Sequence, residues 1–134
     1  MQSSGALSTP RYPLQYPGNL ECWWLISVQD EYAVDLQLHV DTDWTPLCNG
    51  DVVEVFNGIS GDSPVLMRVC GHKVLRSLTS STSNVAVRFK SDAYRRTVRS
   101  GLYFTYSLGV PRGKVYVCCT SFCSELYTFL ISAC

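Results

Sequence analysis

Apolar and polar residues alternate along several stretches of the chain, most regularly over residues 34–41. Every second residue there is apolar, from Val34 to Val40. A period of two is typical of a strand with one buried face and one solvated face. Similar short apolar or alternating runs lie at residues 22–29, 53–55, 65–70, 85–89 and 102–106. The pattern therefore predicts at least six strands.

The predicted strands are separated by turns and polar loops, such as the Asn57-Gly58 turn signal. No stretch shows helical periodicity over three turns, so the sequence predicts an all-β protein built as an antiparallel β-sandwich. Two stretches carry no strand signal. The proline-punctuated first twenty residues indicate an irregular edge segment, and residues 71–83 are polar with little periodicity.

The length of 134 residues fits one domain with a core of its own. The formal net charge is zero and acids and bases are intermixed, which argues against nucleic-acid or anionic-membrane binding. Seven cysteines indicate an oxidising compartment, and an odd number leaves at least one without an intramolecular partner. The start lacks the features of a secretory signal, which favours an excised piece of a larger secreted protein or a fragmentary gene model.

The texture of the chain changes after Leu108. A breaker, Gly109 to Gly113, is followed by four cysteines among apolar residues. This segment is too short for a membrane-spanning helix and is interrupted by Glu125. We expect a domain over residues 1–108 and a cysteine-rich tail, 109–134, that contributes nothing to the core.

Two cysteines flank a predicted hairpin. The strand that starts at Asp51 and the strand that ends at Cys70 would be joined by a turn near Ser60, which brings Cys48 close to Cys70. A disulfide at this place would contribute about 3 kcal/mol by the chain-entropy estimate. The alternative is a pair of free buried thiols.

A succession of short motifs resembles those of a CUB domain, in order and over residues 5–108. The chain is also similar in character to CUB domains of mosaic scavenger-receptor-rich and zona-pellucida-type secreted proteins. The motifs are Ser8-Thr9-Pro10-Arg11-Tyr12-Pro13, Tyr16-Pro17-Gly18-Asn19-Leu20-Glu21-Cys22-Trp23-Trp24, Cys48-Asn49-Gly50-Asp51, Cys70-Gly71, Phe89-Lys90-Ser91-Asp92 and Gly101-Leu102-Tyr103-Phe104-Thr105-Tyr106.

The resemblance implies a jelly-roll β-sandwich that recognises proteins or glycans outside the cell. It also implies that Cys48–Cys70 is the second disulfide of the family. The first family disulfide would join Cys22 to a cysteine upstream of residue 1, so we expect the chain to begin inside its domain. Cys22 is then either unpaired or paired with a cysteine of the tail.

The resemblance further implies a calcium site made by Asp43, Asp51 and Asp92, with Tyr16 in support. Three carboxylates from separate loops repel one another unless a hard cation neutralises them, and calcium prefers oxygen ligands. The sequence departs from the family at two places, since Asp43 stands where glutamate is usual and Arg95 follows Asp92 closely. The alternative is that these are solvated turn aspartates.

Catalytic readings lack the necessary residues. His39 is expected on the exposed face of a strand and His72 in a loop, and neither has a nucleophile at a recognisable spacing. Cys118, Cys119 and Cys123 match no structural zinc site and have no nearby histidine. We therefore expect no enzymatic activity.

The sequence thus predicts a non-catalytic recognition module, secreted or at the cell surface, that binds an extracellular protein or glycoprotein through calcium-ordered acidic loops. An alternative is a spermadhesin-like module that binds glycans through Arg95, Arg96, Arg99 and exposed aromatic residues. A basic loop of this kind is, however, often only a solvated face. A third reading is a non-catalytic arm of a protease.

Overall fold

The computed structural model describes residues 4–27, 32–93, 98–108, 114–119 and 122–124, which form ten strands and one short 3-10 helix. The helix η1 spans Pro46–Cys48. The strands are β1 Ser4–Ser8, β2 Glu21–Ser27, β3 Val34–Asp41, β4 Val52–Phe56, β5 Val65–Val69, β6 Val74–Thr79, β7 Asn84–Lys90, β8 Gly101–Leu108, β9 Lys114–Cys119 and β10 Phe122–Ser124.

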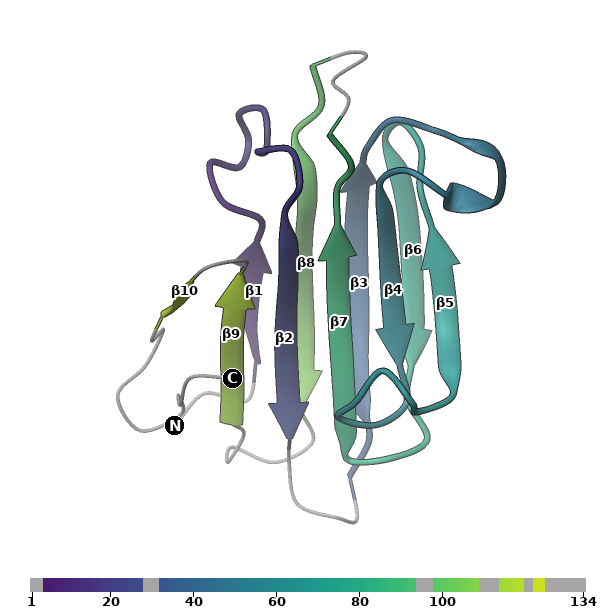
Figure 1. The fold of residues 1–134 in the computed structure, drawn as a ribbon. Helices are drawn as coiled ribbons and strands as arrows, with labels where there is room; N and C mark the ends of the chain where they lie inside the picture. The colour runs from purple at the N-terminus through teal and green to yellow at the C-terminus, as the bar shows by residue number, and fades with distance from the viewer. Residues whose placement is uncertain (1–3, 28–31, 94–97, 109–113, 120–121, 125–134) are drawn as a thin grey trace.

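The strands form two sheets that pack face to face (Figure 1). One sheet has the order β1-β8-β3-β6 and the other the order β10-β9-β2-β7-β4-β5. Every strand pair is antiparallel. The prediction of an all-β antiparallel sandwich is confirmed, and the arrangement is consistent with a jelly roll.

The core lies between the sheets and follows the period-two pattern of the sequence. In β3 the residues alternate between buried and exposed along the whole strand. The ring of Trp24 in β2 meets that of Phe104 in β8 edge to face across the two sheets, with centroids 5.5 Å apart. Burying one face of each strand is the main stabilising contribution to such a sandwich.

All six predicted strands are present, and their observed ends differ from the predicted ends by a few residues. The structure also corrects two expectations. Residues 71–83 contain β6, which pairs with β3 from Asp35↔Thr79 to Val40↔Val74. The proline-rich start contains β1, which pairs with β8. Both are edge strands of the four-stranded sheet, and β6 is largely exposed. An exposed edge needs little apolar periodicity, and this is why the sequence pattern missed β6.

The tail takes part in the six-stranded sheet. Strand β9 pairs with β2 over Cys22↔Cys119 to Ser27↔Lys114, and β10 pairs with β9. Cys22 is disulfide-bonded, so the alternative that it is unpaired is wrong. The other alternative, a bond to a tail cysteine, involves side chains outside those that the structure describes. Strands β9 and β10 therefore extend the six-stranded sheet, and the contribution of the tail to stability stays a prediction.

Four connections gather at one end of the sandwich, drawn at the top in Figure 1. They join β1 to β2, β3 to β4, β5 to β6 and β7 to β8. Because consecutive strands run in opposite directions, every second connection falls at the same end. Tyr16, Asp43, Asp51 and Asp92 lie in or beside these connections.

Candidate functional site

Asp51 is the centre of the acidic end of the sandwich. It immediately precedes β4 and is only 1% exposed. The hydroxyl of Tyr16 donates to Oδ2 of Asp51, and the backbone N–H of Asp92 donates to Oδ1 at 2.9 Å. Tyr16 is itself buried and meets Phe89 edge to face. Three connections that are distant in sequence are thus joined at one carboxylate.

Burial and neighbouring acids oppose the charge of Asp51. Burial raises the pKa of Asp51, and the charges of Asp92 and Asp43 raise it further, against the lowering effect of its two hydrogen bonds. Burial also raises the pKa of Tyr16, as does its hydrogen bond to Asp51. The tyrosine therefore stays a neutral donor. The surroundings of Asp51 thus disfavour its charged form, which is an electrostatic condition that a bound cation would relieve.

Asp43 follows β3 and is 5% exposed. The Nε atom of Arg99 lies 3.7 Å from its Oδ1. That Nε is buried and has no hydrogen-bond partner in the described part of the chain, although the backbone N–H of Arg99 donates to Gln15 at 2.9 Å. Among the described residues, Arg99 is thus a cation that faces Asp43. Arg95, the cation to which the sequence pointed, lies outside the described residues.

Gly50 allows Asp92 to come close to the β3–β4 connection. A Cβ atom at residue 50 would lie 2.6 Å from Oδ2 of Asp92, which is closer than real Cβ contacts. The backbone N–H of Gly50 donates to Oγ1 of Thr45 at 2.9 Å. The backbone of Asp92 is fixed as well, since its carbonyl accepts from the N–H of Asn19 at 3.0 Å.

The donor chemistry of the site suits a hard cation. The charges of Asp43 and Asp92 both act on the pKa of Asp51, and oxygen is the ligand that calcium prefers. Within the ranges that the structure describes, no three His, Cys, Asp or Glu side chains are close enough to hold a metal ion as they stand.

The β3–β4 connection is fixed to β5. The Cys48–Cys70 disulfide has a Cα–Cα distance of 5.7 Å and confirms the predicted pairing. Arg68 in β5 donates to the carbonyl of Leu47 from Nε at 3.3 Å and from Nη2 at 3.2 Å. The same Nη2 donates to the carbonyl of Cys48 at 3.1 Å, and Nη1 pairs with Glu54 at 2.5 Å. One arginine thus links the connection to the sheet.

Asp41 forms a second polar cluster, at the end of β3. Its Oδ2 accepts from the backbone N–H and the hydroxyl of Ser100, both at 3.0 Å, and its Oδ1 accepts from the N–H of Lys73 at 3.3 Å. Nδ1 of His72 lies 2.7 Å from Oδ1 of Asp41 and 2.6 Å from Nη1 of Arg99. Although burial opposes it, the hydrogen bonds from Ser100, His72 and Lys73 lower the pKa of Asp41. The cluster holds the β5–β6 and β7–β8 connections together.

The predicted arginine surface is described only in part. Arg95 and Arg96 fall outside the described residues. The side chain of Arg99 is 22% exposed and faces Asp43. This orientation does not favour the glycan-binding alternative, since a ligand would have to compete with an internal carboxylate for the guanidinium.

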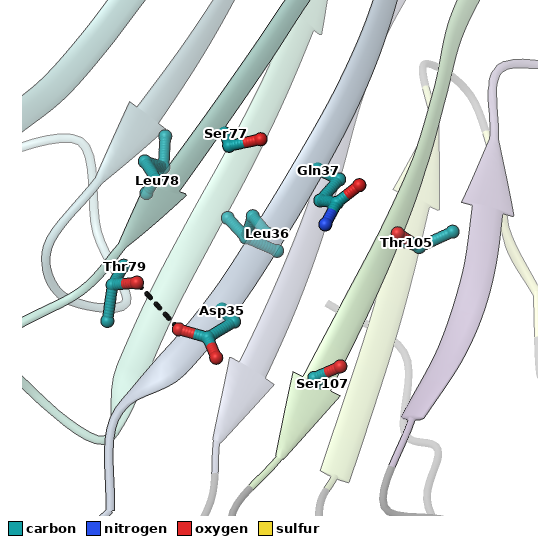
Figure 2. Close-up of a pocket in the computed structure, with 8 residues that line it drawn as sticks. All are labelled: Asp35, Leu36, Gln37, Ser77, Leu78, Thr79, Thr105 and Ser107. Carbon is teal, nitrogen blue, oxygen red and sulfur yellow. Dashed lines mark hydrogen bonds between the residues drawn. The ribbon is translucent and has the colours of Figure 1, made fainter.

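A shallow hollow of about 500 Å³ lies on the outer face of the four-stranded sheet, away from the acids (Figure 2). Most of its lining is hydroxyl, amide or carboxylate, and Thr79 donates to Asp35 across its floor at 2.6 Å. The lining residues are Asp35, Leu36, Gln37, Ser77, Leu78, Thr79, Thr105 and Ser107. No residue named by the sequence analysis as a site residue lies in it.

The family model "CUB domain" matches residues 1–106. The chain belongs to the CUB domain family. CUB domains are typically extracellular protein-interaction modules and are in general non-catalytic.

Curated relatives are much longer than this chain. Human Tolloid-like protein 2 is 34% identical over 90 residues, which are 66% of this chain and 9% of that protein. Human cubilin is 30% identical over 115 residues, which are 84% of this chain and 3% of that protein. The chain thus spans less than a tenth of the length of these relatives.

Solved structures show the same fold. The CUB1-EGF-CUB2 domain of human MASP-1/3 superposes with a TM-score of 0.71 at 26% identity, over 83% of this chain and 43% of that chain. The MASP-1 CUB2 domain bound to Ca²⁺ gives a TM-score of 0.66 at 24% identity, over 80% of this chain and 94% of that chain. The second likeness shows the fold alone. In the described part of this chain, no helix is long and apolar enough to span a membrane.

Proposed function

We propose that this CUB domain is a non-catalytic recognition module, secreted or at the cell surface, that binds an extracellular protein or glycoprotein through acidic loops ordered by calcium. The observation that carries the proposal is the buried carboxylate of Asp51, held by Tyr16 and by the backbone of Asp92, with two further acids acting on its pKa. A cation bound there would stabilise all three charges at once.

Asp43, Asp51 and Asp92 would hold the calcium ion, and Tyr16 would keep Asp51 in position. The bound ion would supply charge neutralisation and would hold the connections at this end of the sandwich in one arrangement. For Asp43 to serve as a ligand, it must give up its neighbour Arg99, 3.7 Å away. Binding of the ion therefore competes with an internal cation.

The partner would present a basic side chain to the remaining acidic oxygens. Asp92 is the most accessible of the three acids, since it is half-buried while the other two are buried. Its position is fixed by backbone hydrogen bonds with Asn19 and Asp51. Carboxylates that are already in place bind a cation without the cost of ordering flexible loops, which increases affinity.

Titration calorimetry with calcium tests the proposal directly. We expect a binding heat for the wild-type chain and none for Asp51→Asn at millimolar calcium. Asp62→Asn is the matched control, because Asp62 is an exposed acid in the β4–β5 connection at the other end of the sandwich, and it should bind like the wild type. Equal heats from the wild type and Asp51→Asn would contradict the calcium site.

A further inference from the structure

Two large apolar side chains are exposed in the β3–β4 connection, beside the acids. Trp44 is 67% exposed and Leu47 is 83% exposed. Trp44 directly follows the buried Asp43. Thr45, between them, contacts Gly50, which in turn lies against the Asp92 carboxylate. We call Trp44 and Leu47 the apolar lip of the acidic site.

The backbone under Leu47 is rigidly held. Leu47 and Cys48 both have left-handed conformations, with φ of 57° and 50°, which are unfavourable for residues with a Cβ. The Arg68 guanidinium binds the carbonyls of both residues, and the disulfide ties Cys48 to the end of β5. The chain thus keeps an apolar side chain in solvent on an unfavourable backbone that other contacts stabilise.

The backbone beside Trp44 is held equally well. Thr42 is fully buried, and its N–H donates to the carbonyl of Gly71 at 2.8 Å while its hydroxyl accepts from the Gly71 N–H at 3.0 Å. Gly71 has a φ of 124°, and a Cβ there would lie 3.7 Å from Cδ1 of Trp44. The indole therefore lies over the β5–β6 connection instead of turning into the core.

We infer that the apolar lip is part of the partner-binding surface, and that it selects an extracellular protein segment in which a basic side chain stands next to a large apolar side chain. This inference rests on the proposed function, which supplies the acidic half of the recognition. A tryptophan and a leucine on a preorganised backbone lose little conformational entropy on binding, and buried apolar anchors beside a charged contact dominate many interfaces. The acidic site would select the basic side chain of the partner, and the apolar lip would select the large apolar side chain next to it.

A random linear heptapeptide library displayed on phage, selected on the immobilised full chain in millimolar calcium, tests this inference. The variants are Trp44→Ser/Leu47→Asn, Asp51→Asn and Ile59→Ser. Asparagine tolerates the left-handed backbone of residue 47. Ile59 is a matched control, because it is 56% exposed and lies in the β4–β5 connection at the opposite end of the sandwich.

The wild type and Ile59→Ser should enrich peptides with Lys or Arg within two positions of a large apolar residue. Trp44→Ser/Leu47→Asn should still enrich Lys or Arg but without an apolar neighbour, and should bind peptides selected on the wild type about tenfold more weakly. Asp51→Asn should lose the enrichment of basic residues.

Three outcomes would overturn the inference. The first is basic enrichment without an apolar neighbour on the wild type, which leaves the proposed function intact. The second is an unchanged selection by Trp44→Ser/Leu47→Asn. The third is apolar enrichment without basic residues, which contradicts the proposed acidic recognition as well as the combined motif.

Discussion

At the residue scale, the role of each carboxylate at the acidic end of this CUB domain depends on the groups that compensate its charge. Asp51 has two hydrogen bonds but two acidic neighbours, while Asp43 has Arg99 beside it. Asp41, two residues before Asp43, accepts hydrogen bonds from Ser100 and from the backbone N–H of Lys73. Similar side chains therefore have opposite roles, since Asp51 would gain from a cation and Asp41 holds the connections together without one.

Removing the internal cation should strengthen calcium binding. In Arg99→Gln, Asp43 loses the guanidinium that competes with the ion, so we expect calcium affinity to rise by about fivefold, the effect of roughly 1 kcal/mol of charge interaction near the surface. Calorimetry measures this. Arg76→Gln, which removes an exposed arginine from β6, should leave the affinity unchanged. Equal affinities in the two variants would show that Arg99 does not oppose the ion.

Asp41→Asn should lower stability at neutral pH. The hydrogen bonds from Ser100, His72 and Lys73 lower the pKa of Asp41 below its ordinary 3.8, so the charged carboxylate stabilises the folded state above that pH. We expect a loss of about 1 kcal/mol at pH 7, measured by urea unfolding. This loss should shrink as the pH falls below 3.8 towards the folded pKa. A difference that stays constant from pH 7 to pH 3.5 would contradict the prediction.

At the element scale, contacts with distant segments stabilise both β2 and the β3–β4 connection. Strand β9 lies next to β2 and pairs with it from Cys22↔Cys119 to Ser27↔Lys114. Without β9, β2 would become an edge strand with unpaired backbone groups along one side. The β3–β4 connection is likewise stabilised from outside itself, by Arg68 and Cys70 of the β5 region.

Truncation after Leu108 should therefore lower stability, contrary to the expectation from sequence alone. The variant loses the strand that pairs with β2, so the backbone groups along that side of β2 lose their hydrogen-bond partners. Thermal unfolding of oxidised material should show a lower midpoint. Cys22→Ser in the full chain separates the disulfide from the strand. An unchanged midpoint after truncation would show that residues 109–134 contribute nothing to stability.

At the scale of the whole molecule, the hydrophobic core and the acidic site occupy different parts of the sandwich. The apolar faces meet between the sheets, while the acids lie at one end, where four connections come together (Figure 1). Tyr16 joins the two, since its ring packs on Phe89 and its hydroxyl donates to Asp51. Stability and ion binding should therefore respond to different substitutions.

Phe104→Leu should destabilise the fold and leave calcium affinity unchanged. Phe104 is fully buried and meets Trp24 across the sheets, so the smaller side chain leaves a cavity and removes a ring contact, which costs about 2 kcal/mol. Urea unfolding and calorimetry measure the two effects. Thr105→Ala, on the outer face of the same strand, should change neither by more than about 0.5 kcal/mol. A matching loss of calcium affinity in Phe104→Leu would show that core and site are coupled.

The sequence by itself determined the fold class and most of the strands. Alternation over residues 34–41 is sufficient because a strand with one buried face must repeat every two residues. It also determined the Cys48–Cys70 pair, since a short hairpin leaves few ways to place the two cysteines. Local pattern was uninformative for β6, an exposed edge strand, and for β9, which lies in a tail without strand periodicity.

Only the tertiary structure decided how the charges of the site are arranged. Asp43 and Arg99 are far apart in sequence, and their approach depends on how the β3–β4 and β7–β8 connections meet at the same end of the sandwich. The exposure of Leu47 likewise depends on Arg68, a contact between distant segments. Periodicity reports which face of a strand is buried, but contacts between connections follow from sheet order and loop path, which no local pattern encodes.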